Sequence, residues 1–198
     1  MKQFVNIHTH FFTGLHTELH ASGIHPWDAE KIDISELDEE YFRNAEAIGE
    51  IGLDFSTNVN REQQIRLFER QLSIAEKLNL PVVLHCVKAL EYTINLLLKY
   101  SLKAIVFHGF IGSKEQAQTA ISKGYYLSFG HRTELSPKTI AALRSTPLER
   151  LFVETDDKDI SIEEMYAIIA NLRGVSIEQL TDATCNNFKT IFTKTNEQ

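Results

Sequence analysis

Four histidines and two acids lie in or at the ends of short apolar runs of this chain, where their side chains could bind a metal ion. The six residues are His8, His10, Glu50, His85, His108 and Asp156. A carboxylate inside an apolar run is costly to bury unless it is paired, hydrogen-bonded or metal-bound. Taken singly, each histidine also fits a hydrogen-bonded core position, and each acid fits a salt bridge or a helix N-cap. Their recurrence at run ends predicts a divalent metal centre.

The sequence His8-Thr9-His10 has a geometry of its own. Residues i and i+2 of a strand point to the same face, so both imidazoles can reach one site. A pair of surface histidines is the alternative.

The types of the candidate ligands indicate which metals they would bind. Mixed imidazole and carboxylate ligands suit Zn²⁺, Mn²⁺, Fe²⁺ or Co²⁺ better than Ca²⁺. Six ligands exceed one tetrahedral site, whereas two ions sharing a carboxylate would use them all. Such ions, about 3.5–4 Å apart, activate a water molecule and hold the attacking and leaving oxygens. We therefore expect two divalent ions, with Zn²⁺, Mn²⁺ and Mg²⁺ as candidates.

Seven short apolar runs, mostly rich in Val, Ile or Phe, resemble buried parallel strands. They are Phe4–Ile7, Leu19–Ile24, Ala47–Leu53, Pro81–Cys86, Ala104–Gly109, Tyr125–Gly130 and Leu151–Asp156. Polar, helix-periodic stretches separate most of them, which predicts an α/β fold with a parallel sheet. In a barrel of this kind the carboxyl ends of the strands meet at one face, so residues far apart in sequence can converge there.

Helix starts are marked by capping patterns between the runs. They are Ser35 with Asp38, Asn60 with Gln63, Ser113 with Gln116, Ser136-Pro137, Ser161 with Glu164, and Ser176 with Gln179. Gly124 and Gly174 fit helix C-termini. In the helix after Asn60, the pattern places Ile65, Phe68, Leu72 and Ala75 on one face.

Composition favours one globular domain over residues 1–198. The chain has 198 residues, 43% of them hydrophobic and 24% charged, and no Gly/Ser/Pro-rich linker divides it. No stretch reaches the roughly 18 apolar residues of a membrane span, and no signal-like h-region opens the chain, so we expect a cytoplasmic protein that does not bind membranes. The net charge of −7 disfavours a broad basic nucleic-acid surface. Phosphate chemistry would therefore need local cations or bound metal.

Six short motifs, in order between residues 8 and 156, resemble the TatD family of metal-dependent hydrolases. They are His8-Thr9-His10, Gly23-Ile24-His25-Pro26, Gly49-Glu50-Ile51-Gly52-Leu53-Asp54, Leu80–His85, Phe107–Gly112 and Glu154-Thr155-Asp156. The block Gly49–Asp54 is the most specific, and it separates this family from histidinol-phosphatase-like barrels that also open with His-x-His.

The resemblance implies a distorted TIM-type (β/α) barrel of the amidohydrolase superfamily with two metal ions. By that likeness His8, His10, Glu50 and Asp156 would hold one ion, and Glu50, His85 and His108 the other, so that Glu50 bridges. His25 would lie near the substrate phosphate. Family members are described as deoxyribonucleases, often 3′→5′ exonucleases, so DNA is the implied partner.

This sequence departs from the family pattern in ways that bear on fold and substrate. The span from His10 to Gly23 is short, which predicts a barrel of seven strands lacking one β/α unit. The segment Asp157–Ile160 lacks the family's Pro-containing loop. The family commonly has an Arg two residues after His85, where the chain has Val87. Lys88 could partly substitute for it and contact a phosphate as a point charge. His131 follows a predicted strand and could also contact the substrate.

The predicted function is a hydrolase in which a two-metal-activated water attacks a phosphodiester of DNA. Asp156 could also accept the proton of that water. One alternative is hydrolysis of a small phosphoester, amide or ester at the same site, and another is a catalytically silent metal-binding protein. We favour a monomer. We also make predictions for three residues near the candidate site residues in sequence. Asp54 could orient a metal ligand, Trp27 could pack near the site or stack on a base, and Cys86 fits a buried thiol.

Overall fold

The computed structural model describes residues 3–192 and divides into two compact units. The terminal unit consists of residues 1–19 and 108–198, and the central unit consists of residues 20–107. The single domain over residues 1–198 stays a prediction.

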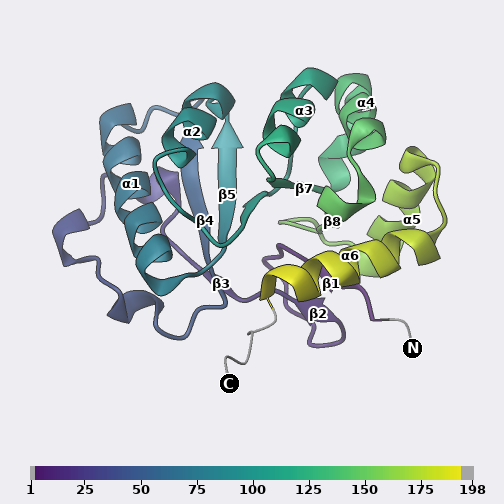
Figure 1. The fold of residues 1–198 in the computed structure, drawn as a ribbon, viewed down its shortest axis with the longest axis horizontal. Coiled ribbons are helices and arrows are strands. Elements are labelled where there is room, and N and C mark those ends of the chain that lie inside the picture. Colours follow the sequence, from purple (N-terminus) through teal and green to yellow (C-terminus); the bar gives the residue numbers. More distant parts are fainter. Residues whose placement is uncertain (1–2, 193–198) are drawn as a thin grey trace. The chain divides into compact units, whose positions relative to one another are not determined.

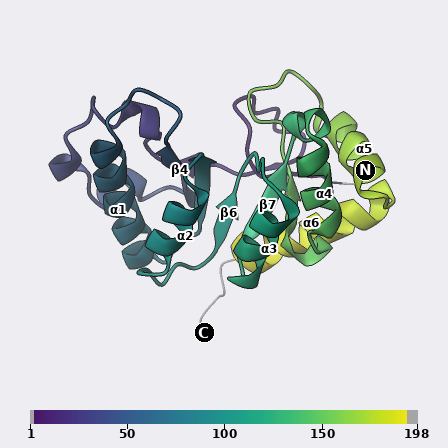
Figure 2. The ribbon, with the colours of Figure 1, turned by 90° about the horizontal axis from the view of Figure 1, so that it is seen from above.

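The central unit is built on four parallel strands in the order β3-β4-β5-β6. They are β3 (Ala21–Ser22), β4 (Ala47–Asp54), β5 (Val82–Val87) and β6 (Ile105–Phe107), with helices α1 (Arg61–Leu78) and α2 (Leu90–Leu97) in the connections. Helix α1 packs on β4 and α2 packs on β5 (Figures 1 and 2). Every residue of β4 is buried except Glu50, which is half-buried. The strand therefore presents a carboxylate from an otherwise apolar run.

Helix α1 begins where the sequence predicts, because the Asn60 side chain accepts a hydrogen bond from Gln63 N (3.1 Å). Its buried face includes Phe68, Leu72 and Ala75 as predicted, but Ile65 is only half-buried. Buried glutamines at positions 64 and 71 occupy that face instead.

The stretch between β3 and β4 contains three 3-10 turns, at Pro26–Asp28, Ile34–Glu36 and Glu40–Phe42. The predicted cap at Ser35 was wrong. Asp33 caps the second turn by accepting from Ser35 N (2.9 Å), and no longer helix follows there. Asp33, two residues before the predicted cap, begins a short turn that already includes Ser35.

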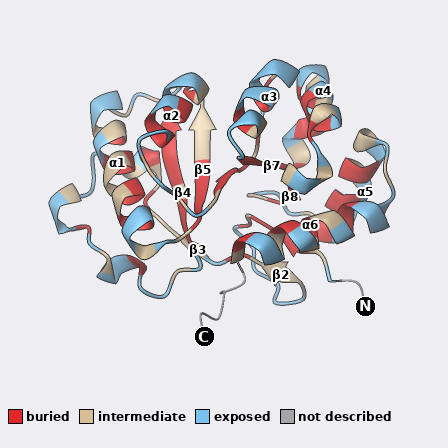
Figure 3. Ribbon diagram, viewed as in Figure 1, coloured by how far each residue is buried: buried red, intermediate tan, exposed pale blue. Residues whose placement is uncertain are grey.

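In its described residues the terminal unit contains two pairs of parallel strands and four α-helices. The strand pairs are β1 (Val5–Asn6) with β2 (Thr17–Glu18), and β7 (Tyr126–Phe129) with β8 (Leu151–Val153); the helices are α3 (Lys114–Ser122), α4 (Pro137–Ser145), α5 (Ile162–Arg173) and α6 (Ile177–Phe192). Ile7 N donates to Val153 O (3.2 Å), so β1 also lies beside β8. Strands β1, β7 and β8 and the facing sides of the helices are buried, whereas β2 is half-buried (Figure 3).

The core of the terminal unit includes one fully buried tyrosine. The hydroxyl of Tyr166 donates to Val5 O (2.9 Å) and lies 2.7 Å from Thr184 Oγ1. Burial raises the pKa of Tyr166, so its proton stays in place at any ordinary pH. These bonds tie α5 and α6 to β1.

Most predicted helix ends of this unit are confirmed. Ser113 and Gln116 form a capping box, and Ser136, Ser161 and Ser176 accept from the expected N3 amides. Gly174 ends α5 with φ 77°, which a glycine adopts without steric cost.

Each of the seven predicted strand runs contains or overlaps a strand, and the alternating α/β class is confirmed. Thr17–Glu18 is a further two-residue strand that the sequence did not signal. Within the described residues, the segment between β1 and β3 contains no helix, as the short span from His10 to Gly23 predicted, but the strand that was expected to be missing is present as Thr17–Glu18. Across residues 3–192, no helix combines the length and apolar character needed to span a membrane.

Candidate metal centre

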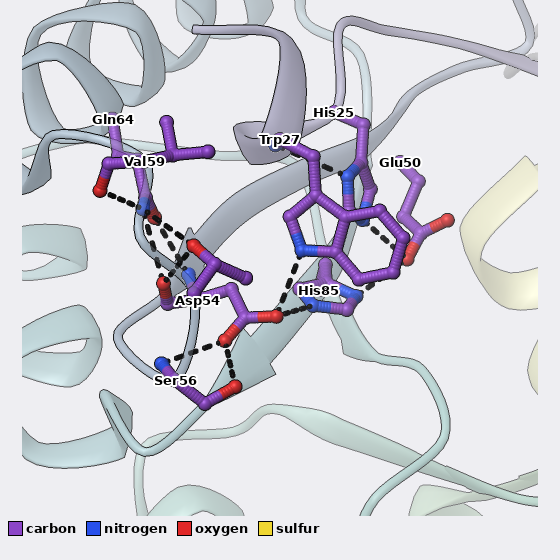
Figure 4. Close-up of polar contacts among 9 residues, drawn as sticks. His25, Trp27, Glu50, Asp54, Ser56, Val59, Gln64 and His85 are labelled. Atoms are coloured by element: carbon purple, nitrogen blue, oxygen red, sulfur yellow. Dashed lines mark hydrogen bonds and ion pairs between the residues drawn. The ribbon is translucent and has the colours of Figure 1, made fainter.

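The central unit gathers two histidines around the carboxylate of Glu50 (Figure 4). Glu50 Oε1 lies 2.7 Å from His85 Nδ1 and 3.5 Å from His25 Nε2. These three side chains are 13–20% exposed, and each offers one ligand atom within 4.8 Å of the others. We call them the Glu50 cluster. Glu50 and His85 are the candidate metal ligands of this set.

Asp54, at the end of β4, lies behind His85 on the side away from Glu50. Its Oδ2 is 3.2 Å from His85 Nε2 and accepts the indole N–H of Trp27 (2.9 Å). Burial raises the pKa of Asp54, but hydrogen bonds from Ser56, Trp27 and His85 outweigh it and lower the pKa to about 2. The carboxylate is therefore charged at neutral pH and can hold the His85 ring with Nδ1 toward Glu50, as predicted for a side chain that orients a ligand.

Two buried glutamines of α1 fix the segments that carry these residues. Gln64 accepts from Asp54 N (2.8 Å) and donates to Asp54 O (3.0 Å). Gln71 accepts from Ile24 N (2.8 Å) and donates to Ile24 O (3.0 Å), which positions the adjacent His25. A seven-residue spacing is close to two helical turns, so both amides share one face. This spacing of two glutamines on an otherwise apolar helix face is visible in the sequence, but it was not used to predict their role.

The backbone sets the proton position on His25. Trp27 N donates to His25 Nδ1 (3.2 Å), so Nδ1 acts as the acceptor. In the neutral ring the proton then lies on Nε2, the atom that faces Glu50. His25 is therefore suited to donate a hydrogen bond from Nε2 rather than to bind a metal there.

The terminal unit holds a second cluster, formed by His8, His10 and Asp156. Asp156 Oδ1 lies 3.5 Å from His8 Nε2 and 3.6 Å from His10 Nε2. The predicted convergence of the two histidines occurs: their ring centroids are 5.2 Å apart. Asp156 adopts a left-handed backbone with φ 54°, which is uncommon outside glycine and gathers at functional sites. We call this the Asp156 cluster.

His108 and Glu154 extend the Asp156 cluster. The His8 and His108 ring centroids are 4.3 Å apart, and one ligand atom each of His108, Glu154 and Asp156 lies within 4.8 Å of the others. Glu154 is 0% exposed, and its Oε1 lies 3.3 Å from His108 Nδ1. Its other oxygen has no hydrogen-bond partner among the described residues. Glu154 belongs to the motif Glu154-Thr155-Asp156, but the sequence pattern did not predict a role for it.

A buried polar network positions the loops of the Asp156 cluster. Asn6 Nδ2 donates to Thr155 Oγ1 (2.8 Å), and Thr155 N donates to Asn6 Oδ1 (3.1 Å). Thr155 Oγ1 donates in turn to Thr9 Oγ1 (3.0 Å). Thr9 lies between the two histidines and Thr155 precedes Asp156, so the network sets the spacing of all three candidate ligands.

The remaining predicted residues lie outside these clusters. Lys88 is exposed directly after β5, with φ 53°. His131 begins the 3-10 turn His131–Leu135 and joins neither group. Burial raises the pKa of Cys86 to about 11, against a hydrogen bond with Thr93 that lowers it, so Cys86 is a protonated thiol rather than a nucleophile.

Comparison with known proteins decides the family. The TatD related DNase family matches residues 12–193. The chain belongs to this family. Human deoxyribonuclease TATDN3 is 31% identical over 87% of this chain and 71% of its own length. The 3'-5' ssDNA/RNA exonuclease TatD of Escherichia fergusonii is 33% identical over 74% of this chain and 65% of its own length.

A solved TatD structure confirms the fold. The crystal structure of YjjV, a TatD homologue from Escherichia coli K12, superimposes with a TM-score of 0.79 at 27% identity, covering 89% of this chain and 77% of its own. The chain is thus a TatD-family metal-dependent hydrolase with a TIM-type α/β fold, as its motifs implied. The number of barrel strands stays a prediction.

Proposed function

We propose that this TatD-family protein is a metal-dependent deoxyribonuclease that hydrolyses phosphodiester bonds. The observation that carries the proposal is the pair of histidine–carboxylate clusters, each with an acid behind a candidate ligand histidine. Two relatives support the substrate class, because one is named a deoxyribonuclease and the other a single-stranded DNA and RNA exonuclease.

In this proposal the clusters hold two divalent ions, Zn²⁺, Mn²⁺ or Mg²⁺. Glu50 and His85 would contribute from the central unit, and His8, His10, His108 and Asp156 from the terminal unit. Bound ions would lower the pKa of a water molecule and stabilise charge on the phosphoryl oxygens. The bridging role of Glu50, which would join ligands of both units, stays a prediction.

The protein's own groups would bind and orient the phosphate. His25 Nε2 carries a proton and faces the Glu50 carboxylate, so it can donate a hydrogen bond to a phosphoryl oxygen. Asp156 would accept the proton of the attacking water. Because the net charge is −7, affinity for the phosphate must come from the ions and from local donors such as Lys88 and His131. A monomeric state and a cytoplasmic location also stay predictions.

The test compares isosteric variants of two candidate ligands with matched controls. Glu50→Gln and Asp156→Asn remove charge with little change in shape, and the exposed Glu36→Gln and Asp159→Asn serve as controls in the same units. The protein is stripped with chelator, reloaded with Mn²⁺, Mg²⁺ or Zn²⁺, and assayed on 3′-labelled single-stranded DNA and on bis(p-nitrophenyl) phosphate.

We expect both ligand variants to remain folded by circular dichroism and to lose measurable hydrolysis, while the controls keep wild-type rates. Unchanged turnover in both ligand variants would overturn the site assignment. Hydrolysis of the small ester without any cleavage of DNA would overturn the proposed substrate and favour the small-phosphoester alternative.

A further inference from the structure

Trp27 is an exposed aromatic side chain that is nevertheless held in one orientation. The residue is 53% exposed, yet its indole N–H donates to Asp54 Oδ2 (2.9 Å). The carboxylate that receives this bond is held in turn by Ser56 N (2.9 Å). A rigid acceptor at one end of the indole therefore limits its rotation.

The backbone of Trp27 is held as well. The residue lies in the 3-10 turn Pro26–Asp28, whose first position is a proline, and its amide donates to His25 Nδ1. Pre-ordering of both backbone and side chain matters for binding, because a ligand that stacks on the indole does not have to immobilise it.

The indole borders the Glu50 cluster (Figure 4). Its ring centroid is 4.6 Å from that of His25 and 6.0 Å from that of His85, with interplanar angles of 82° and 74°. Both imidazoles meet the indole nearly at right angles, so neither stacks parallel to it. An exposed aromatic thus lies directly beside the residues proposed to bind metal and phosphate.

Exposure alone would not distinguish Trp27, because single exposed apolar side chains are common on protein surfaces. Tyr41 and Tyr92 are also exposed in the central unit. Tyr41 packs against Phe42 and Tyr92 against Phe55, rather than against a histidine of the Glu50 cluster. Trp27 combines exposure, fixed orientation and contact with the cluster.

We propose that Trp27 is a stacking platform for one unpaired nucleobase of the substrate, next to the phosphate that is cleaved. This inference rests on the proposed nuclease function and narrows it, because a base can stack on the indole only where it is unstacked from its own strand. The substrate class is then single-stranded DNA or an unpaired end. Aromatic stacking tolerates any base, so it supplies affinity without sequence preference.

The experiment separates the base from the phosphate. A single-stranded oligonucleotide is compared with the same oligonucleotide in which the nucleotide at the cleaved bond is abasic. Loss of one base–aromatic stack weakens binding about 5- to 150-fold. The wild-type protein should therefore show a KM for the abasic substrate higher by a factor in that range.

Three variants give the readout. Trp27→Ala should bring the ratio of the two KM values close to one. Trp27→Phe retains an aromatic face but loses the N–H bond to Asp54, so it should preserve most of the ratio even where overall turnover falls. Tyr41→Ala removes an exposed aromatic that is 56% exposed, and it should leave the ratio at its wild-type value.

A role of Trp27 that is only structural would reduce turnover of both substrates equally and leave the KM ratio intact, and that result overturns the proposal. Equal KM values for both substrates in the wild-type protein also overturn it, although the nuclease function then stands. Failure of the wild-type protein to cleave either oligonucleotide with any metal refutes the nuclease function, and the stacking proposal falls with it.

Discussion

Replacing Glu154 by glutamine should weaken metal binding without destabilising the metal-free protein. The buried Glu154 carboxylate lies 3.3 Å from His108 Nδ1. A ligand histidine that donates its second N–H to a carboxylate is held in one tautomer and becomes a stronger donor to the metal. Glutamine keeps the size and an acceptor oxygen but removes the charge.

The magnitude follows from this geometry. Loss of such an outer partner typically lowers metal affinity about 10- to 100-fold, which corresponds to about 1.4–2.7 kcal/mol. Stability of the metal-free fold should respond in the other direction. Glu154 is 0% exposed and one of its oxygens has no hydrogen-bond partner among the described residues, so a charge there is poorly compensated. The neutral variant should be at least as stable as the wild type.

The assay is calorimetric titration of chelator-stripped protein with Mn²⁺, together with urea unfolding in the absence of metal. The control is Glu164→Gln on the exposed start of α5. If Glu154→Gln binds Mn²⁺ within twofold of the wild type, Glu154 does not support a ligand. If metal affinity and metal-free stability fall together, the residue is a structural contact and the reasoning fails.

Three further predictions concern stability and metal. Gln71→Ala leaves the backbone N–H and C=O of Ile24 without their partner, so it should lower the free energy of unfolding by about 1–3 kcal/mol. The control Gln118→Ala on α3 should leave the free energy of unfolding unchanged. Equal urea midpoints for the two variants would contradict the prediction. Burial raises the pKa of Glu18, but hydrogen bonds from Thr13 and Gly14 outweigh it and lower the pKa below the ordinary 4.5. The ionised Glu18 side chain therefore stabilises the fold fully above pH 4.5, and this stabilisation is lost as the pH falls further. Proteolytic cleavage between residues 11 and 16 should therefore rise below pH 4.5, and a flat profile would refute it. Mn²⁺ at 100 times its Kd should stabilise the fold by about 2.7 kcal/mol, and Asp156→Asn should reduce that gain in a thermal melt.

Much of the candidate site could be predicted because its charged and polar residues lie in or beside apolar stretches of sequence. Glu50 is a carboxylate in a strand that is otherwise fully buried, and such a residue stands out in a sequence without any coordinates. His8 and His10 stand out for a different reason, since strand periodicity alone places them on one face. Both patterns involve residues close together in the chain, so they can be recognised from the sequence alone.

Helices and strands without a capping signal or a hydrophobic period were not predicted. Helix α2 has no side-chain hydrogen bond at its N-cap Ala89, so no start signal precedes it. The strand Thr17–Glu18 is two residues long and half-buried, too short for a period. The cap assigned to Ser35 failed because Asp33, two residues earlier, caps a 3-10 turn that already includes Ser35.

Tertiary pairing explains why one supporting acid was anticipated and the other was not. Asp54 ends β4, the immediate neighbour of β5, so its approach to His85, 31 residues away, follows from adjacent parallel strands. Glu154 and His108 are 46 residues apart, and β7 lies between them in sequence. Their approach depends on how strand ends converge, which no sequence spacing reports. Yet both acids lie within hydrogen-bond distance of a candidate ligand histidine. A buried acid at a strand end is therefore best tested first as the partner of a histidine, and only then as a ligand itself.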